Sequence, residues 1–98
     1  MVEVFTEAMF VENVNSRFRV QNADPPLEIE LIEVTSLSSS PTNVQFSILF
    51  EGPLQVFLPQ QIYRLDHDRL GELDLFLVPI ARDDKGFRYE AVFNRMVE

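Results

Sequence analysis

Strict alternation of apolar and polar residues is the feature that most limits what this chain can fold into. From Ser16 onward, apolar side chains recur at every second position over most of the sequence. This is the period of a β-strand that buries one face. Glycine, proline, asparagine and aspartate separate the alternating stretches and favour turns. The pattern predicts a mainly β protein, either a small antiparallel barrel or a sandwich of about six strands in meander hairpins.

The first predicted hairpin joins two alternating stretches across the turn residues 22–26. Its apolar residues must share one face if the two strands pair; they are Phe18, Val20, Leu27, Ile29 and Leu31. The same register places four charged residues together on the other face, Arg17, Arg19, Glu28 and Glu30. We therefore expect one buried face and one charged face.

The middle of the chain is less regular. The alternation slips at Glu33–Val34, which predicts a bulge, and Ser36–Asn43 has the composition of a surface loop. Val44–Phe50 alternates again and predicts a third strand. Gln55–Leu58, between two prolines, is expected to form a short edge segment.

The stretch 61–79 has the densest apolar alternation in the protein and predicts a second hairpin. Tyr63 and Leu65 should face Leu73 and Leu75, and this register sets Arg64 opposite Asp74. Three further residues make the second face apolar as well, Ile62, Phe76 and Val78. A strand that is apolar on both faces is usually central or covered, so we expect the N-terminal helix to cover it.

Elements at the two ends complete the expected fold. Phe5–Val14 predicts a short helix with Thr6 as its N-cap, and a stripe of apolar residues on it should plug the core. A last hairpin should join Leu73–Ala81 to Phe87–Arg95, with Gly86 in a left-handed turn position.

Composition limits the possible functions. At 98 residues with 46% hydrophobic residues, the chain forms a single domain, 1–98, with enough apolar material for a core. The net charge of −8 disfavours nucleic acids and anionic membranes as partners. Without cysteine there is no disulfide framework and no thiolate nucleophile. No apolar run is long enough to span a bilayer and no signal peptide is evident, so a cytoplasmic location is expected.

The only cluster with metal-ligand chemistry is Asp66-His67-Asp68. In an extended chain the two aspartates point away from the histidine, so we interpret the cluster as a solvated hairpin tip and only as a weak metal candidate. A serine–histidine–aspartate triad lacks its usual glycine-flanked serine. Glu28 and Glu30 have a spacing that glycosidase carboxylates also use, but the neighbouring arginines favour a solvated surface. We expect no catalytic residues, no cofactor and no enzyme activity.

Four segments carry a resemblance to a known family; in sequence they are FSILFEGP (46–53), LPQQIYRLDH (58–67), LGELDLFLVPI (70–80) and YEAVFNR (89–95). They resemble a family of short, uncharacterised bacterial proteins that carry a domain of unknown function. The resemblance implies an accessory role in the assembly of phage-tail-like or tail-fibre-like proteins.

These observations favour a non-enzymatic module that acts through a protein partner or through self-association. Its binding elements would be apolar strand edges or the Ser36–Asn43 segment. The alternative is a small β-barrel that binds an apolar small molecule among its phenylalanines.

Overall fold

The computed structural model describes residues 5–23, 26–39 and 43–96 and shows a closed barrel of six antiparallel strands with one short helix. The elements in chain order are α1 (Glu7–Val11), β1 (Arg17–Val20), β2 (Leu27–Ser39), β3 (Asn43–Gly52), β4 (Gln61–His67), β5 (Gly71–Arg82) and β6 (Phe87–Met96). The strand order around the barrel is β1-β2-β3-β6-β5-β4, and β4 closes onto β1. The mainly β prediction is confirmed, and the fold is a barrel rather than a sandwich.

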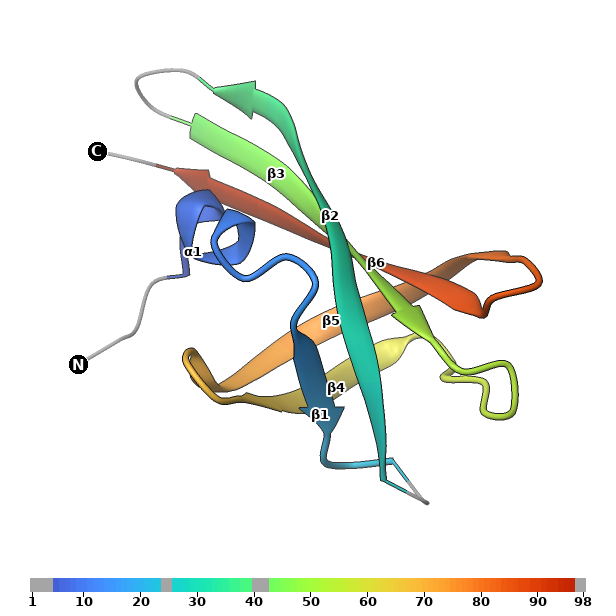
Figure 1. Cartoon of the computed structure of the whole chain (residues 1–98). Coiled ribbons are helices and arrows are strands. Elements are labelled where there is room, and N and C mark those ends of the chain that lie inside the picture. Colours follow the sequence, from blue (N-terminus) through green and yellow to red (C-terminus); the bar gives the residue numbers. More distant parts are fainter. Residues whose placement is uncertain (1–4, 24–25, 40–42, 97–98) are drawn as a thin grey trace.

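Two three-stranded meanders build the barrel, β1–β2–β3 and β4–β5–β6 (Figure 1). They meet along two seams, one between β1 and β4 and one between β3 and β6. The chain therefore does not form one continuous meander, because residues 53–60 cross from β3 to β4. No helix in the described part of the chain is long and apolar enough to cross a membrane.

The predicted registers of the first two hairpins are confirmed, whereas the last predicted hairpin pairs only between residues 78–82 and 87–90, because β5 and β6 then separate. In the first hairpin Phe18 pairs with Ile29, and Arg19 pairs with Glu28. In the second hairpin Tyr63 pairs with Leu75, Leu65 with Leu73, and Arg64 with Asp74. The bulge expected at Glu33–Val34 lies just before these residues, as a register shift between Leu31 and Glu33. The period of two was sufficient to assign these faces, because a slip by one residue would expose every buried side chain.

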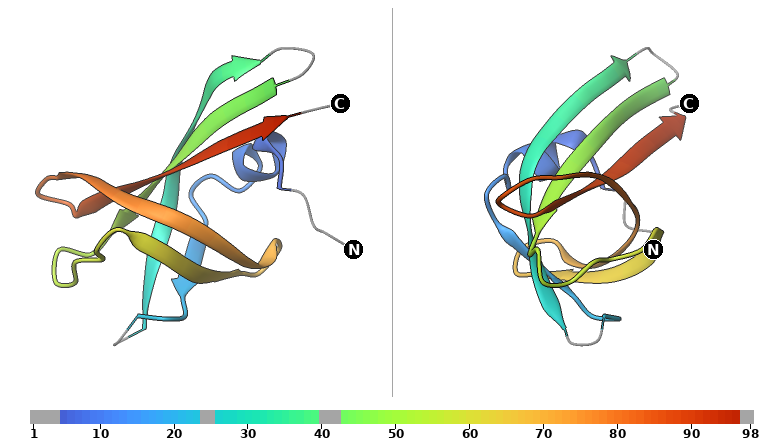
Figure 2. Two further views of the ribbon diagram at one scale, coloured as in Figure 1. Left: turned by 180° about the vertical axis from the view of Figure 1, so that it is seen from behind. Right: turned by 90° about the vertical axis from the view of Figure 1, so that its right-hand side faces the viewer.

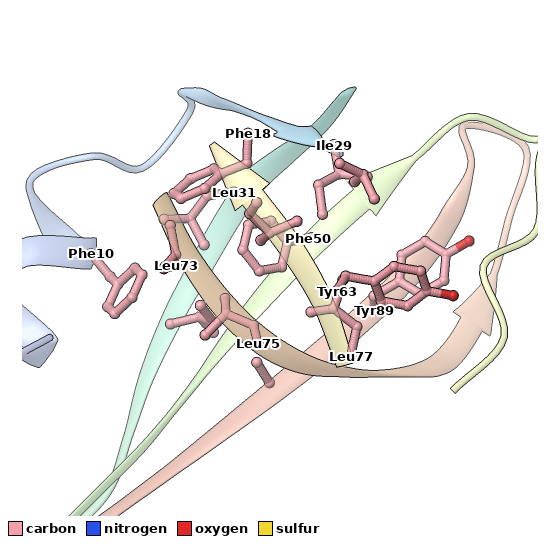
Figure 3. Packing of buried hydrophobic residues seen from close by; sticks show 14 of the residues in the cluster. Phe10, Phe18, Ile29, Leu31, Phe50, Tyr63, Leu73, Leu75, Leu77 and Tyr89 are labelled. Carbon is pink, nitrogen blue, oxygen red and sulfur yellow. The ribbon is translucent and has the colours of Figure 1, made fainter. Parts of the chain in front are cut away.

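Large apolar side chains fill the barrel interior (Figure 3). At its centre the rings of Phe18 and Phe50 meet edge to face with centroids 5.2 Å apart. At the end crossed by residues 53–60, the Tyr89 hydroxyl accepts a hydrogen bond from the Leu58 amide at 3.0 Å, and the Tyr63 hydroxyl donates to the Pro59 carbonyl at 2.5 Å. The tyrosines therefore hold the crossing segment over this end.

The helix closes the opposite end of the barrel. Phe10 is fully buried, and its ring centroid lies 6.0 Å from that of Phe46 and 5.2 Å from that of Phe93. The predicted N-cap is confirmed, since Thr6 Oγ1 accepts a hydrogen bond from the Met9 amide. The α-helix is shorter than expected because the chain must turn into β1, which it does through Asn15 at φ 74°.

Three local expectations are wrong. Residues 36–39 belong to β2 rather than to a loop, because pairing with β3 overrides the serine-rich composition; residues 40–42 lie outside the described part. Gln55–Leu58 is not a strand. The left-handed glycine is Gly71 at φ 76°, whereas Gly86 is needed because a Cβ there would lie 2.1 Å from the Gly52 carbonyl oxygen.

Candidate functional site

His67 is the only histidine, and it is buried with 4% of its surface exposed. The interpretation of a solvated hairpin tip is therefore wrong at this residue. Its Nδ1 accepts hydrogen bonds from the backbone amides of Arg69 and Leu70, both at 3.1 Å. Its ring also packs on Phe18, with centroids 4.3 Å apart. The histidine thus forms the turn between β4 and β5 and packs against the core.

The hydrogen bonds assign the tautomer of His67. Because Nδ1 accepts two N–H groups, the proton of the neutral ring lies on Nε2, which donates to Ser16 Oγ at 2.8 Å. Ser16 Oγ in turn donates to the Asn13 carbonyl at 2.5 Å. A general base would have to accept the serine proton, so this pair has the reverse arrangement of a catalytic dyad.

Burial lowers the pKa of His67 below its usual 6.5. The positive charges of Arg19 and Arg69 lower this pKa further, whereas Asp68 and Asp66 oppose the shift. The neutral ring that the two Nδ1 hydrogen bonds require is therefore also the favoured state.

Asp66 and Asp68 face Arg19 rather than His67. Arg19 Nη2 lies 2.6 Å from Asp66 Oδ2 and 2.9 Å from Asp68 Oδ1. Hydrogen bonds to the two carboxylates raise the pKa of Arg19. The weak metal candidates Asp66, His67 and Asp68 are thus divided between an ion pair and the core. Within the described ranges no three metal-binding side chains gather in one place.

These contacts belong to a larger set that closes the seam between β1 and β4. The backbone ladder there consists of only two residue pairs, Arg19 with Asp66 and Val20 with Leu65. Beyond it, the Gln21 amide donates to the Arg64 carbonyl at 2.8 Å, and the Arg64 amide donates to Asn22 Oδ1 at 2.9 Å. Hydrogen bonds outside the ladder and ion pairs therefore extend this short seam on both sides.

A second short ladder, between β5 and β6, ends differently. Its residue pairs run from Arg82 with Phe87 to Val78 with Glu90. Beyond that point β6 continues to Met96 beside β3, while residues 71–77 of β5 pair with β4. The two strands diverge there in Figure 1 and Figure 2. We call this divergence the β5–β6 split.

Exposed apolar side chains lie on the outer face beside the split. Ile62 and Phe76 are direct cross-strand partners and are 62% and 49% exposed. Ile80 is 51% exposed and Val78 is half-buried. We call these four residues the outer patch. The alternation identified the shared face of Ile62, Phe76 and Val78, but the expectation that α1 covers it is wrong, because α1 closes the barrel end.

The helix also borders an apolar groove with a volume of about 590 Å³. Phe5, Val11 and Phe46 provide its apolar walls, while Glu7 and Glu12 also line it. Nothing in the alternation of the strands indicated this groove, because it depends on how the helix rests on β3.

A protein family described as a domain of unknown function, DUF6916, matches residues 5–93. No curated protein and no solved structure shows a significant match to the chain.

Proposed function

The chain belongs to the DUF6916 family, and we propose that it is a non-enzymatic protein-interaction module. The family match covers α1, β1 to β5 and β6 as far as Phe93, so the proposal concerns the whole domain. A role in the assembly of phage-tail-like or tail-fibre-like proteins is the setting that the sequence resemblance favours.

The outer patch is the observation that carries the proposal. The inner face of the β4–β5 hairpin is buried through Tyr63, Leu65 and Leu75, yet the outer face exposes Ile62 and Phe76 directly opposite each other. Single exposed apolar residues are common, but neighbouring ones with polar residues beside them mark contact sites. A partner would remove both side chains from water.

The surroundings of the outer patch favour a basic partner. Two residue pairs along the ladder from Ile62 and Phe76, Arg64 Nε donates to Asp74 Oδ1 at 2.7 Å, so this arginine already has a carboxylate partner. The whole chain carries a net charge of −8, which attracts positively charged surfaces. The partner we propose is a protein with an apolar contact surface surrounded by lysine or arginine.

A second candidate is a small apolar ligand in the groove beside α1. The groove volume of about 590 Å³ lies within the range of small-molecule sites. Inside the barrel, by contrast, the centre is filled by the protein's own side chains, including Phe18 and Phe50. The ligand, if one binds, would therefore lie beside the helix rather than in the barrel.

The test is affinity purification from the source organism with the wild-type domain and with Phe76→Asp and Ile62→Asp as baits. We expect each substitution to reduce recovery of a specific partner by about tenfold or more. Leu37→Asp is the comparison, because Leu37 is 51% exposed on β2 and belongs to the alternative binding segment Ser36–Asn43, so a loss of recovery with this variant alone would place the partner there instead. Equal recovery with all variants would exclude the outer patch. A co-purifying small molecule without a protein would favour the second candidate.

A further inference from the structure

We propose that the free edge of β6 accepts an extended segment of a partner protein as an added strand. The segment would alternate apolar with basic residues. The inference rests on the proposed function and specifies how the partner binds. It concerns the part of β6 beyond Glu90, which has left the β5 ladder but still pairs with β3.

Backbone geometry places unpaired groups on this edge. The Asp83 amide donates to the Gly86 carbonyl at 3.0 Å, so the backbone of Gly86 faces β5. Successive residues of a strand direct their N–H and C=O groups to opposite sides, and β6 pairs with β3 without a register shift. Val92 and Asn94 therefore face the split. Within the described residues, no strand pairs with them there.

Strands β2, β3 and β6 form a three-stranded sheet, and its other edge, on β2, is protected. Beyond Leu31, β2 has two register shifts, and its exposed side chains there include Glu33 and Thr35, which bond to each other at 3.1 Å. Bulges and charges of this kind prevent edge-to-edge pairing in natural sheets. From Ala91 to Asn94, β6 has no bulge, proline or charged residue. The two edges differ in the way expected if only one receives a strand.

Side chains beside the split define the chemistry of the added strand. Val92 is 59% exposed on the outer face of β6, and Phe76 is 49% exposed on β5. Successive residues of an added strand point to opposite faces, so its apolar residues would turn inward, toward the half-buried Phe93. Its lysine or arginine residues would lie on the outer face, with their methylene groups beside Val92 and Phe76 and their charges available to the exposed Glu72 and the half-buried Glu90. Main-chain hydrogen bonds to Val92 and Asn94 would supply affinity.

Amide hydrogen exchange of the free monomer tests the edge without knowledge of the natural partner. We expect the amides of Val92 and Asn94 to exchange quickly, and those of Ala91 and Phe93, which face β3, to be at least about tenfold slower. The four residues are consecutive on one strand, so differences in local stability are small. Equal protection of all four amides in a monomer would overturn the proposal.

Binding is tested with a short peptide of alternating valine and lysine, compared with alternating valine and glutamate. The lysine peptide should protect the amides of Val92 and Asn94, and the glutamate peptide should not. Val92→Pro removes an edge donor, whereas Val92→Thr keeps it, so only the proline variant should bind about tenfold or more weakly. Proline is tolerated at an edge position whose N–H does not bond to the neighbouring strand.

Three results would contradict this assignment. Equal binding by Val92→Pro and Val92→Thr would exclude strand addition. Protection confined to Ile62 and Phe76 would leave the interaction function standing but place the partner on the outer patch alone. Dimerisation of the free protein that Val92→Pro abolishes would identify a second copy, rather than a basic partner, as the added strand.

Discussion

The β1–β4 seam and the β5–β6 split are two short ladders in one barrel, and they end in opposite ways. At the seam only two residue pairs form, but Gln21, Asn22 and Arg64 carry hydrogen bonds beyond them. At the split the ladder stops at Val78 and Glu90, and exposed apolar residues stand on both sides. A short ladder therefore does not by itself leave a free strand edge. The edge is free only where no neighbouring side chain or backbone group bonds to the N–H and C=O groups beyond the ladder.

The largest expected effect is a difference in unfolding free energy between the same substitution made beside the seam and beside the split. Phe18→Ala removes a fully buried ring that packs on Phe50 and His67 beside the β1–β4 seam, and should cost about 3–5 kcal/mol of unfolding free energy. Phe76→Ala, at the split, should cost about 0.5 kcal/mol or less. Urea unfolding measures both values. Similar losses for the two variants would mean that the split is as closely packed as the seam.

Substitutions of His67 should have the next largest effect and separate the two functions of its ring. Leucine leaves the amides of Arg69 and Leu70 without their acceptor, which should cost about 1–3 kcal/mol. Asparagine offers Oδ1 near the position of Nδ1 and should recover part of this loss. Glutamine reaches toward Ser16 instead and should recover less. If asparagine and leucine destabilise equally, the turn does not depend on Nδ1.

Acidification should lower the stability of the protein by a smaller amount, through protonation of His67. The pKa of His67 is lowered in the folded protein from its usual 6.5, so the unfolded chain takes up this proton first as the pH falls. The contribution of His67 is fully present above pH 6.5 and decreases below it, until the folded protein also binds the proton. Asp74 and Asp83, whose pKa values lie below 3.8, titrate later.

Urea unfolding between about pH 7 and about pH 5 isolates this effect. The wild type should lose stability over that interval, whereas His67→Asn should lose less. An identical pH dependence for the two proteins would show that His67 does not control it.

The sequence was enough to predict the strands and their faces, because the alternation of apolar and polar residues indicates for each residue whether its side chain is buried. It predicted the pairing of Arg64 with Asp74 and the cap at Thr6. It failed where a distant element decides. The burial of His67 depends on Ser16 and Phe18, which lie far away in the chain, and the exposure of Phe76 depends on where α1 rests. Neither the burial of His67 nor the exposure of Phe76 can be predicted from the local alternation of apolar and polar residues.

The crossing from β3 to β4 also determines how the barrel can form. Each meander can assemble from neighbouring strands, but Arg19 and Asp66, which close the β1–β4 seam, are 47 residues apart. During synthesis one side of β1 stays unpaired until β4 has emerged. Contacts of such long sequence separation slow folding. The barrel cannot close until β6 has emerged, because the β3–β6 seam joins the first meander to the last strand of the chain.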